Sequence, residues 1–223
     1  MGNDLPLSAR GAPPVSVQVW GEGALFTRPE LKVERVSYPV MTPTAAVGIL
    51  ESIYWKPEFA WRPVAIDVLK PIRQFTQRRN ETIDVASVAD AALRGRTVDT
   101  VANRAQRNAV CLRDVAYRIH AHVELREHAD KPEAAYRDQF RRRVERGRCF
   151  HQPYLGTREF SAYFGPVDDA DLHPITEDLG IMLHGVHYAE DGSVSFTWFT
   201  AHLDGGRLHI PRDGIRADLG AGV

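Results

Sequence analysis

The stretch Cys111-Leu-Arg-Asp-Val-Ala-Tyr-Arg-Ile-His-Ala-His-Val-Glu-Leu125 alternates between apolar and polar side chains along most of its length. A period of two is typical of a β-strand, in which successive side chains point to opposite faces. The apolar face carries Val115, Tyr117, Ile119, Ala121, Val123 and Leu125. The polar face carries Asp114, Arg118, His120, His122 and Glu124. We expect the apolar face to pack on helices and the polar face to be charged and open.

Toward the N-terminus, three segments predict a strand–helix–strand unit. Residues 15–20 alternate strictly and predict a strand with its valines inward. Thr42 and Pro43 supply the N-cap and first-turn proline of a helix, and Pro57 stops that helix. Residues 59–72 are rich in β-branched side chains and predict the second strand.

On either side of the central strand, the chain predicts a long insert, a second helix and a fourth strand. Residues 73–110 are polar and rich in arginine, and we expect a long β-hairpin insert there. Lys131 and Pro132 begin a helix with Tyr136, Phe140 and Val144 at a spacing of four. A fourth strand is expected near residues 152–164, around the segment Tyr-Leu-Gly-Thr-Arg-Glu-Phe.

The predicted fold is α+β, with a ferredoxin-like (RRM-like) βαββαβ domain that carries an extended β-hairpin insert. In RRM modules the open sheet face binds RNA. We expect a loose leader over residues 1–14, the ferredoxin-like domain over 15–165, and a small antiparallel β-sheet domain over 166–223. The strands of this second sheet are expected near residues 181–188, 193–202 and 207–210, separated by Asp-Gly turns.

The charge of the chain is segregated although its total is only -1. Residues 62–148 hold 17 Arg and 2 Lys against 12 acidic residues, whereas residues 149–223 hold 4 Arg against 11 acidic residues. This asymmetry favours a polyanion partner for the middle segment. Codon usage in a GC-rich genome is an alternative explanation for the excess of Arg over Lys, but it does not explain the segregation.

The cysteines and the hydropathy pattern indicate a cytoplasmic protein. Cys111 and Cys149 form no close pair, so neither a disulfide framework nor a metal knuckle is expected. No apolar run reaches the roughly 18 residues that a membrane span needs. We expect no membrane partner and no cofactor, and we find no Walker-type glycine loop, G-x-S-x-G or H-E-x-x-H motif.

Two groups of residues are candidates for chemistry. Tyr54, Trp55 and Lys56 follow the first helix, where a phenol, an indole and an ammonium suit a site for a base and a phosphate. The alternative is an aromatic helix end within the core and a solvated lysine. Arg118, His120 and His122 share one strand face and suit proton transfer with phosphate binding. A metal site completed by Asp114 or Glu124, and a solvated polar face, are the alternatives.

Several motifs resemble the Cas family five proteins of CRISPR subtype I-C, the "d" or "c" variant of the RAMP superfamily. The resemblance extends over nearly the whole chain after residue 14. It rests on Val19-Trp-Gly-Glu-Gly-Ala-Leu-Phe-Thr-Arg-Pro29, Glu51-Ser-Ile-Tyr-Trp-Lys-Pro57, Leu69-Lys-Pro-Ile72, Arg78-Arg-Asn-Glu81, Leu112-Arg-Asp-Val-Ala-Tyr117, Tyr154-Leu-Gly-Thr-Arg-Glu159 and Met182-Leu-His-Gly185, in this order.

The resemblance implies an endoribonuclease that needs no metal and cleaves the CRISPR precursor transcript at its repeat hairpin. The attack of a ribose 2′-OH would leave a 2′,3′-cyclic phosphate and a free 5′-OH. The protein would then stay on the 5′ handle with the backbone and large subunits of the I-C surveillance complex. Duplex DNA remains open as a further partner, because related proteins bind it.

For the catalytic set, the resemblance implies a tyrosine together with a lysine and a histidine in the third-strand region. Tyr54 matches the tyrosine. The lysine has no clear counterpart, and Arg118 stands in that region with His120 and His122 nearby. The residues predicted to bind RNA are Lys56, Arg73, Arg78, Arg79, Arg113, Arg141 and Arg142. A non-catalytic subunit that binds the guide-RNA handle is the first alternative, and a metal-dependent DNA nuclease is the second.

Overall fold

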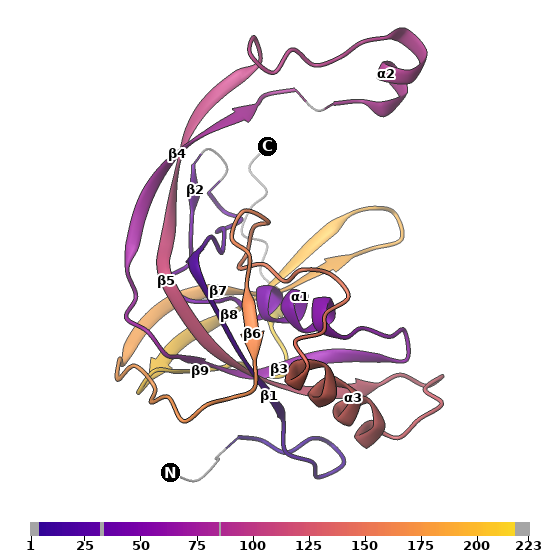
Figure 1. Cartoon of the computed structure of the whole chain (residues 1–223), viewed down its shortest axis with the longest axis vertical. Helices are drawn as coiled ribbons and strands as arrows, with labels where there is room; N and C mark the ends of the chain where they lie inside the picture. Colours follow the sequence, from indigo (N-terminus) through magenta and orange to yellow (C-terminus); the bar gives the residue numbers. More distant parts are fainter. Residues whose placement is uncertain (1–4, 32–33, 85, 217–223) are drawn as a thin grey trace.

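A computed structural model describes residues 5–31, 34–84 and 86–216 (Figure 1). Its ten named strands join one sheet, in which β10, β8, β9, β3, β5, β1 and β6 follow one another, while β2 and β4 also pair with β5 and β7 pairs with β8. The elements are β1 (Val15–Ala24), β2 (Arg35–Val36), α1 (Pro43–Ile53), β3 (Phe59–Val68), β4 (Gln74–Thr82), α2 (Val88–Arg94), β5 (Arg104–Leu125), α3 (Glu133–Glu145), β6 (Tyr163–Gly165), β7 (Glu177–Tyr188), β8 (Val194–Asp204), β9 (Arg207–His209) and β10 (Ile215–Arg216). Within the described residues, no helix combines the length and the apolar character needed to cross a membrane.

The strand β5 is the centre of the sheet, as its alternating sequence predicts. It pairs antiparallel with β1 on one side and with β3 on the other, and β6 lies beyond β1. Val17 lies opposite Ile119, and Trp61 lies opposite Val123, so their side chains share the apolar face. Both α1 and α3 contact the sheet, and the rings of Trp61 and Phe140 lie 4.7 Å apart on this face. The expected packing of the apolar face on helices is confirmed.

The two long helices begin where the sequence predicts, and α1 also ends there. The Thr42 hydroxyl accepts a hydrogen bond from the Ala45 amide at 3.3 Å, and Pro43 begins α1. At the other end, the backbone of Tyr54 is extended, and Pro57 follows. In α3 the residues Tyr136, Phe140 and Val144 are buried, which matches their spacing of four.

The strand β4 and the first half of β5 form a long two-stranded arm. Their register runs from Gln74 opposite Leu112 to Thr82 opposite Arg104, and α2 lies near the tip. Figure 1 shows this arm projecting away from the rest of the molecule. The arm has few buried side chains, so its polar sequence is consistent with exposure on both faces.

Two predictions about the sheet are corrected. The C-terminal strands are not a separate second sheet, because β9 pairs with both β8 and β3 and so continues the first sheet. The fourth strand is shorter and later than expected, since only Tyr163–Gly165 pairs with β1. The preceding segment forms a loop because Gly156 has a φ of +87°, and a Cβ there would lie 2.1 Å from the Leu25 carbonyl oxygen.

The polar face of the central strand is not open, contrary to the expectation from its sequence. His120 is 4% exposed and His122 is 1% exposed. The His122 ring contacts the Pro6 carbonyl oxygen at 2.8 Å, and Arg118 donates to the carbonyl oxygens of Asp168 and Ala170. The described part of the expected loose leader therefore lies across the sheet, while its residues 1–4 lie outside the described residues.

Candidate functional site

The structure separates the residues that the sequence places in one catalytic set. Tyr54 packs on Phe59 with ring centroids 5.6 Å apart, and Phe59 lies on the helix-covered face with Trp61. His120 lies opposite Ala65, and His122 lies opposite Arg62, on the other face of the same sheet. Because paired residues share a face and neighbours alternate, the sheet itself stands between Tyr54 and the two histidines.

Tyr54 lies where the C-terminal ends of α1 and α3 meet. Its side chain is 8% exposed, and the Arg143 guanidinium carbon lies 5.4 Å from the ring centroid. Arg143 also donates a 2.9 Å hydrogen bond to the Ile53 carbonyl oxygen, which ties the two helix ends together. Burial raises the pKa of the phenol, an effect that the nearby Arg143 partly offsets. The phenol is therefore protonated at neutral pH and can donate a proton.

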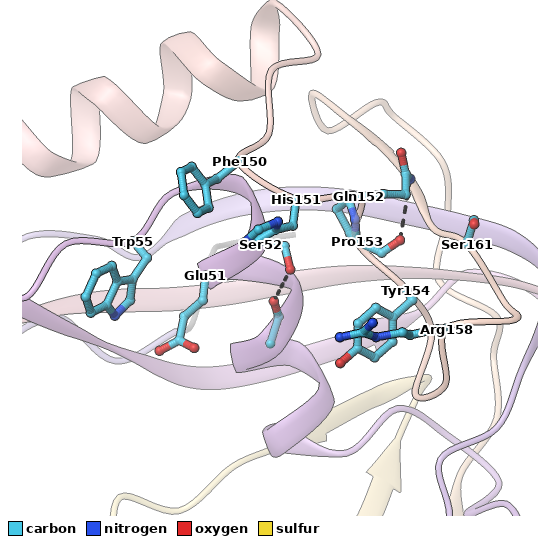
Figure 2. A pocket seen from close by; sticks show the side chains of 11 residues that line it. Glu51, Ser52, Trp55, Phe150, His151, Gln152, Pro153, Tyr154, Arg158 and Ser161 are labelled. Carbon is cyan, nitrogen blue, oxygen red and sulfur yellow. Dashed lines mark hydrogen bonds between the residues drawn. The ribbon is translucent and has the colours of Figure 1, made fainter. Parts of the chain in front are cut away.

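A groove of about 860 Å³ runs beside this helix junction (Figure 2). Its floor is one face of α1, formed by Gly48, Glu51, Ser52 and then Trp55 just beyond the helix. Its other wall is the segment after α3, which Ser52 anchors by accepting hydrogen bonds from the amides of Phe150 and His151. The groove is lined by Gly48, Glu51, Ser52, Trp55, Phe150, His151, Gln152, Pro153, Tyr154, Arg158 and Ser161.

A second, basic hollow of about 400 Å³ lies at the C-terminal end of α3. It is lined by Gln139, Arg142, Arg143, Arg146, Gly147, Arg148 and Cys149. Cys149 is followed directly by Phe150, so the chain leads from this hollow into the groove. Guanidinium groups bind phosphate through paired N–H donors. The helix junction thus places a cluster of guanidinium groups next to an aromatic groove.

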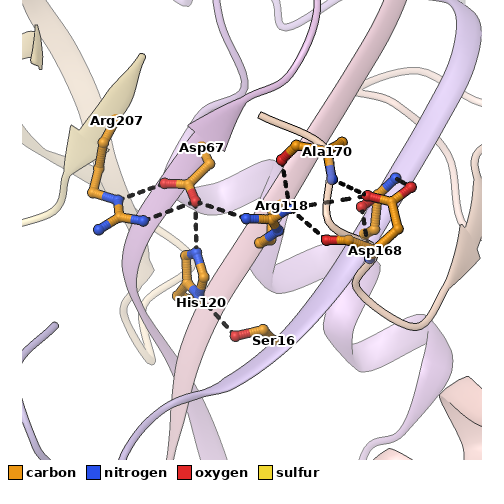
Figure 3. Close-up of polar contacts among 8 residues, drawn as sticks. Ser16, Asp67, Arg118, His120, Asp168, Ala170 and Arg207 are labelled. Carbon is orange, nitrogen blue, oxygen red and sulfur yellow. Dashed lines mark hydrogen bonds and ion pairs between the residues drawn. The ribbon is translucent and has the colours of Figure 1, made fainter. Parts of the chain in front are cut away.

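On the opposite face, a buried polar network surrounds Asp67 (Figure 3). Its carboxylate accepts hydrogen bonds from Arg207 at 2.6 and 3.0 Å and contacts the His120 ring at 2.9 Å. The other ring nitrogen of His120 lies 2.7 Å from the Ser16 hydroxyl, and an Arg118 nitrogen lies 3.8 Å from Asp67. The network joins β1, β3, β5 and β9, and its position indicates a role in holding the sheet together.

His122 is held in a different small cleft under the N-terminal segment. One ring nitrogen contacts the Pro6 carbonyl oxygen, and the other has no partner within the described residues. Burial lowers the pKa of this imidazole, which keeps it neutral. The cleft has a volume of about 310 Å³ and is also lined by Glu133 and Arg62.

The arginines predicted to bind RNA are spread over three regions. Arg78 and Arg79 lie on the arm, where Arg79 pairs with Glu159. Arg73 lies just before the arm, and Arg113 lies over the Phe75 ring at 5.2 Å. Arg141 and Arg142 lie in the last turns of α3, whereas Lys56 is exposed beside Trp55. Of this set, Lys56, Arg141 and Arg142 lie at or close to the helix junction.

Metal ligands do not gather in the part of the chain that the structure describes. No group of three or more His, Cys, Asp or Glu side chains is arranged to hold an ion among these residues.

Residues 15–209 match the family model of the Cas5d type, described as CRISPR-associated protein (Cas_Cas5). The chain belongs to the Cas5d family. The resemblance to the Cas family five proteins of subtype I-C is confirmed by this match.

Two curated relatives of this Cas5d-family chain carry the same name, CRISPR pre-crRNA endoribonuclease Cas5d. The protein of Mannheimia succiniciproducens is 41% identical, over 88% of this chain and 94% of the relative. The protein of Thermus thermophilus is 45% identical, over 79% of this chain and 75% of the relative.

Solved structures share the fold of this Cas5d-family chain. One, described as a CRISPR-associated protein, has a TM-score of 0.64 at 24% identity and covers 88% of this chain and 90% of its own. Another, from a CRISPR RNA-guided surveillance complex, has a TM-score of 0.51 at 13% identity and covers 95% of this chain and 94% of its own.

The sequence of this Cas5d-family chain did not predict the groove, and Trp55 was the one lining residue that it placed among the candidates for chemistry. The missed wall, with Phe150, His151 and Tyr154, follows directly on the helix α3. A signal was available, because three rings and an arginine within nine residues are unusual for a polar loop. Because aromatic residues are also common in strands, this cluster was interpreted as part of the fourth strand that was expected at residues 152–164.

Proposed function

We propose that this chain cleaves the CRISPR precursor transcript at its repeat hairpin and then stays on the 5′ handle within the surveillance complex. The observation that carries the proposal is the endoribonuclease name of both curated relatives, at 41% and 45% identity. The fold shared with a chain of an RNA-guided surveillance complex supports the assembly. The basic hollow beside Tyr54 supports the binding of an RNA backbone at this end of the molecule.

The chemistry that we propose is the attack of a ribose 2′-OH on the adjacent phosphorus, without a metal ion. The O–P bond to the 5′ oxygen breaks, which leaves a 2′,3′-cyclic phosphate and a 5′-OH. Tyr54 would give its phenol proton to the leaving oxygen, since the phenol is protonated at neutral pH. The attacking 2′-OH would lose its proton to solvent water, and the Tyr54 phenolate would take a proton back from solvent. Arg143 beside the ring and the exposed Lys56 would stabilise the charge on the phosphorane.

We also infer that the central strands and the two long helices form a ferredoxin-like layout. The order β6-β1-β5-β3, antiparallel throughout, supports this inference, as do the positions of α1 and α3 in the chain.

A second candidate function is a non-catalytic subunit that binds the guide-RNA handle. The observation in its favour is the burial of Tyr54, whose side chain is 8% exposed. The same basic surface and fold would serve that function, so only a cleavage assay separates the two.

The test is the incubation of the cognate repeat RNA with the protein in excess EDTA. We expect one cut at full rate, and a product that carries the cyclic phosphate. A repeat with deoxyribose at the cut site should stay intact while it binds with similar affinity. Loss of cleavage in EDTA would overturn the metal-independent mechanism, and tight binding without any cut would favour the non-catalytic subunit.

The basic hollow predicts a change in the salt dependence of RNA binding. Each phosphate contact in single-stranded RNA contributes roughly 0.7 to the slope of log affinity against log salt. Replacing Arg142, Arg146 and Arg148 by Gln should therefore lower the slope by about 2, measured by fluorescence anisotropy between 50 and 200 mM salt. The control replaces two arginines, Arg10→Gln and Arg212→Gln, in the cleft on the other sheet face and should leave the slope unchanged. An equal effect of the two sets would contradict the assignment.

A further inference from the structure

The groove holds two large aromatic rings that face solvent and that stack on no other Phe, Tyr or Trp ring among the described residues. Trp55 is 52% exposed and Phe150 is 71% exposed, although both line the same groove. Figure 2 shows the two rings at the same end of the groove, away from Tyr154 and Arg158, with Glu51 between Trp55 and Ser52. Phe150 contacts only the His151 ring edgewise, at 4.4 Å, among the described aromatic contacts. Exposed rings at a concave, partly basic surface are the usual platform for an unpaired base.

The polar group next to these rings is a carboxylate. Glu51 lies on the floor of the groove, and within the described parts of the chain no hydrogen bond or ion pair engages its oxygens. Burial raises the pKa of this carboxyl, and Arg126 partly offsets the effect. Such a group keeps phosphates away by charge repulsion, but it accepts hydrogen bonds from a base edge that presents N–H donors.

We propose that the groove binds one unpaired guanine base of the RNA, stacked on Trp55 and Phe150, with its Watson–Crick edge on the Glu51 carboxylate. Guanine presents two adjacent donors there, the N1–H and the 2-amino group, which match the two carboxylate oxygens. Adenine and cytosine present one amino donor beside an acceptor nitrogen, and that nitrogen would face the carboxylate unfavourably. This inference rests on the proposed RNA-binding function and adds that the aromatic groove of the protein selects guanine.

The surrounding charges fit a nucleotide in this orientation. Arg158 lies on the opposite wall of the groove from Glu51, and the basic hollow of α3 continues beyond Phe150. Phosphates on either side of the stacked base can therefore lie on arginines while the base lies on the carboxylate side. The volume of about 860 Å³ is within the range of small-molecule sites and leaves room for a sugar and its phosphates.

The test measures equilibrium binding of the full chain to labelled 2′-O-methyl hexauridylates with a single central guanosine, inosine or adenosine. These oligonucleotides cannot be cut by 2′-OH attack, so the result does not depend on whether the chain is a ribonuclease. Inosine keeps the N1–H and lacks the 2-amino group. We expect the guanosine hexamer to bind about 10-fold more tightly than the inosine hexamer, the value of one hydrogen bond to a charged group.

Variants assign this preference to the groove. In Glu51→Gln the preference for the guanosine hexamer over the inosine hexamer should shrink, because the amide has one acceptor oxygen where the carboxylate has two. Trp55→Ala and Phe150→Ala should each weaken binding of every hexamer by about 5- to 100-fold. The matched control is Tyr188→Ala, which removes an exposed ring on β7 and should leave the affinity for every hexamer unchanged. Equal binding of guanosine and inosine by the wild type, or an unchanged preference in Glu51→Gln, would overturn the proposal even if the repeat is cleaved normally.

Discussion

Replacing Tyr54 by Phe should lower the single-turnover rate of repeat cleavage by about 10²- to 10⁴-fold, while repeat binding changes by less than about twofold. The range is the usual contribution of a positioned proton donor. The substitution removes only the hydroxyl, and no hydrogen bond of that hydroxyl exists among the described residues. The ring packing on Phe59 and the Arg143 guanidinium over the ring both remain possible for Phe.

The rate is measured with trace labelled repeat RNA and excess protein, so that substrate binding and product release do not limit it. Because packing is preserved, the free energy of unfolding of Tyr54→Phe should stay within about 0.5 kcal/mol of the wild type. Tyr188→Phe, which removes an exposed phenol on β7, is the matched control and should cleave at the wild-type rate. Wild-type cleavage by folded Tyr54→Phe would exclude the phenol from the chemistry.

Local periodicity predicted the elements that carry Tyr54 and the sheet histidines. The alternation along residues 111–125 and the spacing of Tyr136, Phe140 and Val144 depend only on neighbours in the chain, and both are found as predicted. Tyr54 could be singled out in the same way, because the proline at 57 and the aromatic pair before it mark the end of α1.

The covering of the polar sheet face could not be predicted from the same pattern. The alternating pattern that contains Arg118, His120 and His122 is the same whether water or protein covers that face of the strand. His120 is buried because Asp67 and Ser16, 53 and 104 positions away in sequence, supply its partners. The groove is also non-local, since its two walls come from α1 and from the segment after α3. Such sites depend on how elements pack, which periodicity does not encode.

The buried network around Asp67 predicts a large loss of stability from a single substitution. Asp67→Asn should lower the free energy of unfolding by roughly 3 to 5 kcal/mol, because it leaves Arg207 and Arg118 without their buried counter-charge. In a chain of this size, each kcal/mol lowers the melting temperature by about 2 to 4 °C. The measurement is thermal and urea unfolding followed by circular dichroism.

The Asp67 carboxylate also predicts how the free energy of unfolding depends on pH in acid. Burial alone would raise the pKa of Asp67, but the hydrogen bonds and charges of His120 and Arg207 outweigh it and hold the pKa at about 2. The unfolded chain has the ordinary value of 3.8 and therefore takes up the proton first as the pH falls. The network thus contributes roughly 2 to 3 kcal/mol above pH 4, and this contribution is lost as the pH falls from about 4 to 2.

The matched control for Asp67→Asn is Asp114→Asn, which breaks an exposed ion pair with Lys70. That pair lies in water, so its loss should change the free energy of unfolding by no more than about 1 kcal/mol. Asp67→Asn should also flatten the acid dependence between pH 4 and 2, whereas Asp114→Asn should leave most of it. If the two variants were equally stable and equally sensitive to acid, the Asp67 network would not stabilise the contact of β9 with the central sheet. The continuity of the sheet would then depend on the backbone pairing of β3 with β9, in which Ala65, Ile66 and Asp67 lie opposite His209, Leu208 and Arg207.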